Sequence, residues 1–166
     1  MLTSHELLGF MSPGLALEIL AYANQSDKPL YRATLNAVAE ARKLRPAYLE
    51  RKPRAERHTL MLATLTRPTL DWLTGNLIRT WLLKKYNGML VDFLNTLELP
   101  HKEGVVDDLP ASVDDAKLRA TIDLLLSKYP PEVVAVYLQA FNDMNEADWP
   151  NLKAMLESDQ RLQLGA

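Results

Sequence analysis

The sequence predicts an all-α protein, a compact array of about eight or nine helices built from antiparallel helix hairpins. Apolar side chains recur every three or four residues along most of the chain, and this spacing gives a helix one apolar face. Pro, Ser and Asp also stand repeatedly where helices would begin. The clearest apolar stripes are Leu70, Leu73, Leu77 and Trp81, then Leu118, Ile122, Leu125 and Tyr129, and then Val133, Tyr137, Phe141 and Met144.

These stripes also predict the core. The valine-rich segment 133–136 has the composition of a strand, but the four-residue spacing continues beyond it and favours a helix. No other segment is a convincing strand. On the longest helices, the side chains that we expect to be buried are Leu73, Leu77, Trp81, Leu118, Ile122, Leu125, Tyr137 and Phe141.

The helices of the first half are marked by capping residues and prolines. Thr3 and Glu6 have the spacing of a capping box, and Ser12 precedes a helix that begins at Pro13. A further helix is expected from about Pro29 to Lys43. The other helices predicted in this half cover residues 46–52, 54–66 and 68–86.

The second half contains similar signals. Asn87-Gly88 is a natural stop for the preceding helix. Ser112 with Asp115 has capping-box spacing, and Asp148 is expected to cap the last helix. The predicted helices cover residues 89–99, 113–129, 131–145 and 149–158. Helix–Pro–helix junctions that predict hairpins occur at Lys28-Pro29, Arg67-Pro68 and Pro130-Pro131.

The chain is long enough for one domain with a substantial core. It has 166 residues, of which 48% are hydrophobic and 24% are charged, the balance of a globular protein. We therefore expect a single all-α domain over 1–166, with a subdivision into 1–99 and 112–164 as the alternative. The segment 100–111 is the one long connection, and it is either a solvated linker or a functional loop.

The absence of certain residues and patterns limits the chemistry and the cell location that we expect for this protein. The chain has no cysteine, which excludes disulfides and thiolate chemistry. Its first residues lack the basic start and apolar run of a secretory signal, and no uncharged apolar run is long enough to suggest a membrane span. The sequence therefore predicts a soluble, cytoplasmic protein that does not enter a membrane.

No pattern in the sequence indicates a cofactor, a metal or a catalytic centre. The histidines His5, His58 and His101 do not have the spacing of metal ligands. Phosphate-binding glycine loops and the serine-hydrolase elbow are absent from the sequence. We predict no metal and no cofactor, and no catalytic residues can be assigned.

Charge is concentrated in "RKLRPAYLERKPRAERH", residues 42–58. Residues 42–57 carry seven basic and two acidic side chains, a sum of +5, so the rest of the chain sums to −7 within the overall −2. The basic residues form a candidate anion-binding site: Arg42, Lys43, Arg45, Arg51, Lys52, Arg54 and Arg57. Nucleic acid or another anion is the ligand class that such a site predicts.

The competing interpretation of this segment is structural. Five of its seven cations fall at predicted helix ends, where positive charge is favourable, but Arg54 and Arg57 fall in a first turn, where it is not. Pro46 and Pro53 break the segment into two corners. We expect its charges to face water, helix ends or nearby carboxylates, and the acidic run 103–115 offers counter-charges.

A second candidate site surrounds Gly75, which lies inside a predicted helix. Glycine there weakens a helix and marks either a close helix crossing or room for a ligand. The residues of this candidate pocket are Trp72, Gly75, Asn76 and Arg79. Trp72 and Trp81 are expected to belong to the core.

Taken together, these features favour a non-catalytic helical binding module. Its partner is expected to be another protein or a second copy of the chain. The alternatives are nucleic-acid or other anion binding through residues 42–57, and ligand binding or catalysis in a pocket near Gly75.

Overall fold

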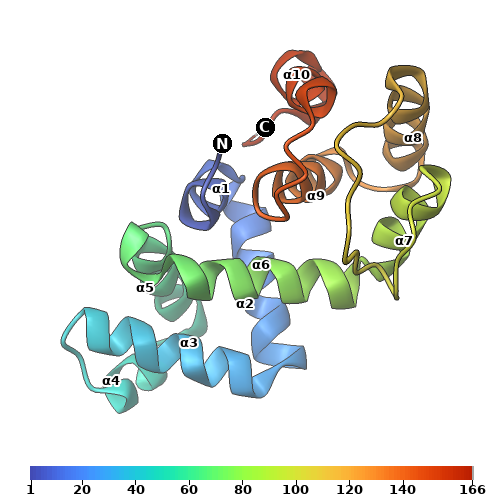
Figure 1. The fold of residues 1–166 in the computed structure, drawn as a ribbon. Helices are drawn as coiled ribbons and strands as arrows, with labels where there is room; N and C mark the ends of the chain where they lie inside the picture. The colour runs from blue at the N-terminus through green and yellow to red at the C-terminus, as the bar shows by residue number, and fades with distance from the viewer. Residues whose placement is uncertain (166) are drawn as a thin grey trace. The chain divides into compact units, whose positions relative to one another are not determined.

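The computed structural model describes residues 1–165 and confirms the all-α class (Figure 1). Within these residues there is no β-sheet, and a single bridge between Lys102 and Val105 closes a turn. The helices are α1 (Ser4–Phe10), α2 (Pro13–Ser26), α3 (Lys28–Ala41), α4 (Pro46–Arg51), α5 (Arg54–Leu65), α6 (Asp71–Lys85), α7 (Asn87–Thr96), α8 (Asp115–Lys128), α9 (Pro131–Asp143) and α10 (Pro150–Ser158), with 3₁₀ turns η1 (Pro68–Leu70) and η2 (Gln160–Leu162). The hairpin arrangement of neighbouring helices stays a prediction.

The chain packs as two compact units. Residues 3–81 form one, here called the N-unit, and residues 1–2 with 82–165 form the other, the C-unit. Helix α6 contributes to both, because the division falls between Trp81 and Leu82. This boundary differs from the sequence-based subdivision across 100–111, a segment that lies within the C-unit.

The two units carry opposite charge. The N-unit has eleven Lys and Arg residues against seven Asp and Glu, a formal charge of +4. The C-unit has eight Lys and Arg residues against fourteen Asp and Glu, a formal charge of −6. The uneven charge of the sequence therefore follows the division of the fold.

The N-unit is organised around α2, α3, α4 and α5. Helix α2 packs against α3 and α5, and α3 packs against α4 and α5. Figure 1 shows α4 as a short helix at the corner between α3 and α5. The core between these helices is apolar, with Leu20, Leu35, Val38, Leu49, Met61 and Leu65 all buried.

The core of the C-unit is centred on an aromatic cluster. Phe93 of α7 lies with its ring centroid 5.0 Å from Phe141 and 5.3 Å from Tyr137, both on α9. Trp149 packs on Phe141 at 5.1 Å. Around this cluster α7 contacts α8, and α9 contacts α8, α10 and η2. Burial raises the pKa of Tyr137 far above its ordinary value, so this hydroxyl stays neutral.

The predicted core residues are confirmed. Each is at most 3% exposed: Leu73, Leu77, Trp81, Leu118, Ile122, Leu125, Tyr137 and Phe141. Trp72, by contrast, is 64% exposed, so the expectation that it belongs to the core was wrong. It stands one residue before the buried Leu73 and therefore points to a different side of α6.

Two helix starts predicted at prolines, Pro13 and Pro29, were correct to within one residue. The Ser12 hydroxyl accepts the Leu15 N–H at 3.4 Å and caps α2, as predicted. Helix α3 begins one residue before Pro29, and Asp27 caps it by accepting the Leu30 N–H at 3.2 Å. Thr3 occupies the N-cap of α1, but its side chain makes no cap bond. The capping box predicted there is therefore not formed.

Two cap signals in the second half were misread. Asp114, not Ser112, caps α8, accepting the Lys117 N–H at 3.0 Å. Trp149, not Asp148, is the N-cap residue of α10, and Asp148 has a left-handed φ of 47°. The stop predicted before Asn87-Gly88 is correct to within one residue, because α6 ends at Lys85, although Asn87 itself begins α7 directly after Tyr86. Each misread residue lies within two positions of the true boundary, where several polar residues compete for one role.

The long connection before α8 is anchored to the C-unit by side chains. The Trp149 Nε1–H donates to the Pro110 carbonyl at 2.9 Å, and Asn151 donates to the Val113 carbonyl at 3.0 Å. Asn87 donates to the Glu103 carbonyl at 2.7 Å. The chain from 100 to 113 is thus tied down at several points rather than left as a free linker.

Among the helices of residues 1–165, none combines the length and apolar character that crossing a bilayer requires.

Candidate functional site

The basic segment forms the two corners that its prolines predicted. Helix α3 ends at Ala41, α4 runs from Pro46 to Arg51, and α5 begins at Arg54. At the first corner Lys43 adopts a left-handed φ of 56°, and the Leu44 N–H reaches back to the Ala39 carbonyl at 2.8 Å. This is the usual hydrogen-bond closure of a helix C-terminus, formed here without glycine.

The seven cations of this segment have different surroundings. Arg42 donates its Nε–H to the Thr64 hydroxyl at 2.6 Å, and Arg57 is held by several groups of the N-unit. The remaining cations form no ion pair with any of the residues 1–165; they are Lys43, Arg45, Arg51, Lys52 and Arg54. Lys52 instead lies with its Nζ 4.9 Å from the ring centroid of Tyr48.

Arg57 has a structural role that its position in the sequence conceals. Its Nη1 donates to the carbonyls of Glu50 and Lys52, at 3.1 and 3.5 Å. These carbonyls end α4, where helix carbonyls have no partner within the helix and favour a positive charge. The sequence suggested that no helix end explains Arg57, and this was wrong, because the cation serves the preceding helix rather than its own.

A partly buried chain of hydrogen bonds continues from Arg57. Its Nε–H donates to the Tyr31 hydroxyl at 2.8 Å, and that hydroxyl lies 2.9 Å from His58 Nε2. Burial, and then the charges of Arg57 and Arg54, lower the pKa of His58 to about 4. His58 is therefore neutral at pH 7, and its Nε2 shares a hydrogen bond with the Tyr31 hydroxyl.

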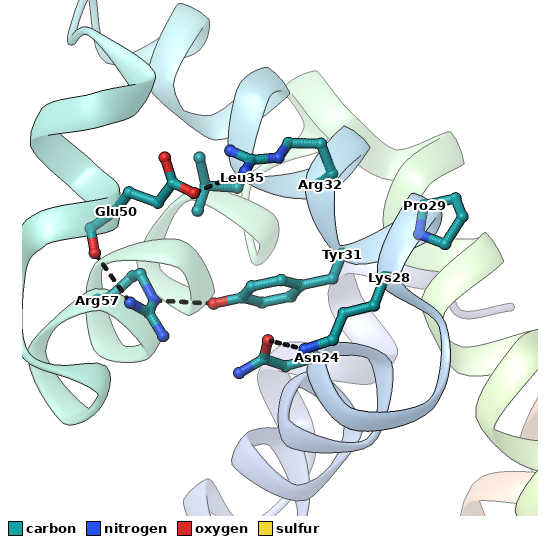
Figure 2. A pocket seen from close by; sticks show the side chains of 8 residues that line it. All are labelled: Asn24, Lys28, Pro29, Tyr31, Arg32, Leu35, Glu50 and Arg57. Atoms are coloured by element: carbon teal, nitrogen blue, oxygen red, sulfur yellow. Dashed lines mark hydrogen bonds and ion pairs between the residues drawn. The ribbon is translucent and has the colours of Figure 1, made fainter.

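Beside this chain lies a hollow of about 450 Å³, here called the cationic pocket (Figure 2). Helix α2 contributes one lining residue, α3 contributes five, and α4 and α5 contribute one each: Asn24, Lys28, Pro29, Tyr31, Arg32, Leu35, Glu50 and Arg57. Three of these side chains are cations and one is a carboxylate. The pocket therefore carries a formal charge of +2.

The pocket's charges are only partly compensated. Arg32 pairs with Glu50 at 2.6 Å, and their hydrogen bond raises the pKa of Arg32 and lowers that of Glu50. Both side chains are exposed, and a pair of this kind contributes little to stability. Lys28 makes a long contact of 3.4 Å with the Asn24 side-chain oxygen.

A second, more open hollow runs beside α5. Its volume is about 590 Å³, and it is called here the α5 groove. Ala55, Thr59 and Ala63 line it at four-residue spacing, which places them along one side of the helix. The other lining residues are Arg42, Lys52, Glu56 and Leu60. The structure thus divides the basic segment between two sites, with Arg57 in the cationic pocket and Arg42 with Lys52 at the groove.

The candidate pocket near Gly75 stays a prediction. Gly75 is buried within α6 and Asn76 is half-buried, whereas Trp72 and Arg79 are exposed. The cationic pocket and the α5 groove are lined by other residues.

The cation of a hollow in the C-unit is already paired with carboxylates. A hollow of about 150 Å³ in the C-unit contains Arg161, but this cation is already paired with Asp123 at 3.0 Å and Asp159 at 2.7 Å. Across residues 1–165, no group of three or more histidine and carboxylate side chains gathers in a way that could hold a metal ion.

Sequence reasoning missed most of the cationic pocket. Lys28, Tyr31, Arg32 and Leu35 have the spacing of one helix face, and this was the available signal. What the sequence did not reveal was that α4 and α5 would bring Glu50 and Arg57 to the same face.

No protein-family model, curated protein or solved structure matches this chain.

Proposed function

We propose that the N-unit is a binding module and that its α5 groove, with the cations around it, binds an acidic segment of a partner protein. The observation that carries this proposal is the uncompensated charge of the basic segment. Lys43, Arg45, Arg51, Lys52 and Arg54 have no ion-pair partner within residues 1–165, in a unit whose formal charge is +4. Such a surface attracts acidic partners and speeds their association.

The groove itself suits an amphipathic helix. Ala55 and Ala63 have small side chains, which let a second helix approach α5 closely, and Leu60 adds apolar surface. Arg42 and Lys52 also line the groove and can meet carboxylates on the partner. Apolar contact along a groove with charges at its border is a common mode of peptide recognition.

Several features favour a protein partner over nucleic acid. The two corners keep the cations from forming one continuous row, and Glu50 and Glu56 interrupt them. Tyr48 is the one aromatic residue of segment 42–57, and Lys52 already lies against its ring. Proteins that bind single strands generally offer several stacking side chains along a basic channel.

The proposal is tested by titrating the full chain into a labelled acidic peptide of about 18 residues, with Leu and Ala on one helical face and Glu on the other. Reversing the charge of Lys52, which lines the groove, and of Arg54, the first residue of α5, with Lys52→Glu and Arg54→Glu together, should weaken binding about tenfold, since each exposed pair contributes up to about 1 kcal/mol. Fluorescence anisotropy measures the affinity.

The matched control reverses two exposed arginines elsewhere in the N-unit, Arg67 and Arg79, to Glu. It changes the net charge equally and should weaken binding less than about twofold. Equal weakening by both double variants would contradict a defined site. Ala63→Gln does not change the charge, but it should also weaken binding because the longer side chain fills the groove. An unchanged affinity would contradict the proposed apolar contact between the partner and the groove.

Two further outcomes would redirect the proposal. DNA or RNA that binds more tightly than the peptide near physiological salt, and loses this binding in Lys52→Glu/Arg54→Glu, would assign the surface to nucleic acid. An increase of molar mass with concentration, abolished by the same variant, would make a second copy of the chain the acidic partner. Light scattering measures the second outcome.

A further inference from the structure

We infer that the cationic pocket is a separate site for a small organic anion, a carboxylate or phosphate group carried on an apolar body. This goes beyond the proposed function, because the pocket is a different hollow from the α5 groove and none of its lining residues lines that groove.

The first argument is charge. Three cations, Lys28, Arg32 and Arg57, and one carboxylate, Glu50, line a hollow of about 450 Å³. A volume of this size is within the usual range for small-molecule sites. The pocket's surplus of two positive charges selects an anion, and a single carboxylate does not suffice to hold a metal ion.

The second argument is that Arg57 is preorganised, because hydrogen bonds within the protein already hold its guanidinium in one orientation. Its Nε and Nη1 are fixed by the Tyr31 hydroxyl and by the Glu50 and Lys52 carbonyls. Its Nη2 has no acceptor within residues 1–165. A guanidinium that is already held in place loses little conformational freedom when its remaining donors bind an oxyanion.

The third argument concerns the apolar part of the ligand. Figure 2 shows the Tyr31 ring between Arg57 and Lys28, with Pro29 and Leu35 also lining the hollow. Tyr31 is 8% exposed and its hydroxyl is engaged at both sides, so the ring is fixed. A fixed ring among aliphatic side chains offers a surface to an aromatic or aliphatic body.

A carboxylate of the pocket, Glu50, competes with the ligand for Arg32. Glu50 occupies Arg32 at 2.6 Å, so a bound anion has to share or displace this carboxylate. Removing its charge by Glu50→Gln should therefore strengthen binding, an effect that a merely structural pair would not produce. Lys28, whose contact with Asn24 is long, is free to turn toward a ligand.

The experiment is a titration of the full, isotope-labelled chain followed by amide chemical shifts. The probes are benzoate, phenyl phosphate, inorganic phosphate and, as the neutral control, benzyl alcohol. We expect benzoate or phenyl phosphate to shift the amides of residues 24–35 and Glu50 in a saturable way, with a dissociation constant of about 1 mM or lower. The tighter of the two identifies the preferred anionic group.

Two pocket variants should change the affinity for the anion in opposite directions. Glu50→Gln should tighten binding about threefold and Lys28→Gln should weaken it about threefold, as expected for gaining or losing one exposed charge pair. Arg67→Gln removes a cation outside the pocket and should leave the affinity unchanged. Arg57→Lys keeps the positive charge but replaces the planar guanidinium, with its several N–H donors, by a single ammonium group. This variant should bind the anion more weakly, provided that its amide spectrum shows an intact fold.

Three results would overturn the inference: no saturable shift up to about 10 mM, equal shifts with benzyl alcohol, or insensitivity to both Lys28→Gln and Glu50→Gln. Inorganic phosphate that binds as tightly as phenyl phosphate would refute the apolar part of the site. The amides of Thr59 and Ala63, which belong to the α5 groove, should not respond. Failure of this site is therefore distinguishable from failure of the proposed function.

Discussion

Arg57 donates its Nε–H to the hydroxyl of Tyr31 at 2.8 Å, across 26 residues of sequence. The same hydroxyl lies 2.9 Å from Nε2 of the buried His58. One phenol oxygen thus joins the first turn of α5 to the first turn of α3, and it satisfies a cation and an imidazole at once. The pocket and the corner of the basic segment both depend on this oxygen.

Tyr31→Phe tests that dependence. The substitution leaves the buried His58 Nε2 and the Arg57 Nε–H without their partner, which should lower the free energy of unfolding by about 1–3 kcal/mol. Urea denaturation of the full chain measures the change. Tyr48→Phe is the control, because Tyr48 is 54% exposed and should change stability by less than about 0.5 kcal/mol. Equal effects at the two tyrosines would contradict the buried chain of hydrogen bonds.

His58 should make stability depend on pH. Its pKa is about 4 in the folded protein and about 6.5 in the unfolded chain, so between these values the unfolded state binds more protons. The free energy of unfolding should therefore fall as pH falls from about 6.5 to about 4, and His58 adds no further loss below that. Denaturation at several pH values measures the slope.

His58→Gln provides the comparison for this slope. Glutamine keeps a side chain that can form a hydrogen bond with the Tyr31 hydroxyl, and it does not titrate. The parent protein should lose more stability than this variant between pH 6.5 and 4, and the two should run in parallel at higher pH. Parallel curves over the whole range would contradict this account, because they would show that folding does not shift the pKa of His58.

Two neighbouring leucines of α8, one buried and one exposed, test whether the apolar stripe of this helix faces the core. Leu125 is completely buried and Leu124 beside it is 38% exposed. Leu125→Ala should cost about 2–5 kcal/mol of stability because it removes packed methyl groups and leaves a cavity. Leu124→Ala should cost less than about 1 kcal/mol. Thermal or urea denaturation that ranks the two variants the other way would show that the stripe faces the wrong side.

Trp149 should control the order of the long connection. Its indole N–H binds the Pro110 carbonyl at 2.9 Å, while its ring packs on Phe141. Trp149→Phe keeps an aromatic ring but removes the donor, so the amides near Pro110 should exchange their hydrogens faster. Hydrogen exchange read by mass spectrometry tests this, with α5 as the internal reference. Unchanged exchange around residues 107–113 would mean that other contacts hold the connection.

Local signals in the sequence were enough to predict the all-α class and the core. The spacing of Leu118, Ile122 and Leu125 expresses helix geometry directly, and burial followed that geometry without exception among the predicted core residues. The start of α2 could be predicted from Ser12 and Pro13 because a cap hydrogen bond joins residues only three positions apart in the sequence. Trp72 failed because a single aromatic residue does not show which side of its helix is apolar.

The candidate site depended on long-range contacts and was only partly predictable. The basic segment drew attention by its charge, and its two corners followed from Pro46 and Pro53. The role of Arg57 could not be read locally, because its partner Tyr31 lies on another helix. The cap of α8 shows a different limit, since Ser112, Asp114 and Asp115 all have suitable side chains and only the backbone path selects Asp114.

The central claim is that the α5 groove receives an acidic partner segment, and mapping the contact on the full chain tests it most directly. The isotope-labelled protein is titrated with the acidic amphipathic peptide near physiological salt, and amide shifts are followed at every assigned residue. The claim predicts that the largest saturable shifts lie at Lys52, Ala55, Thr59, Leu60 and Ala63 and disappear in Lys52→Glu/Arg54→Glu but not in Arg67→Glu/Arg79→Glu. Shifts spread evenly over all exposed cations, or centred outside α5, would contradict it.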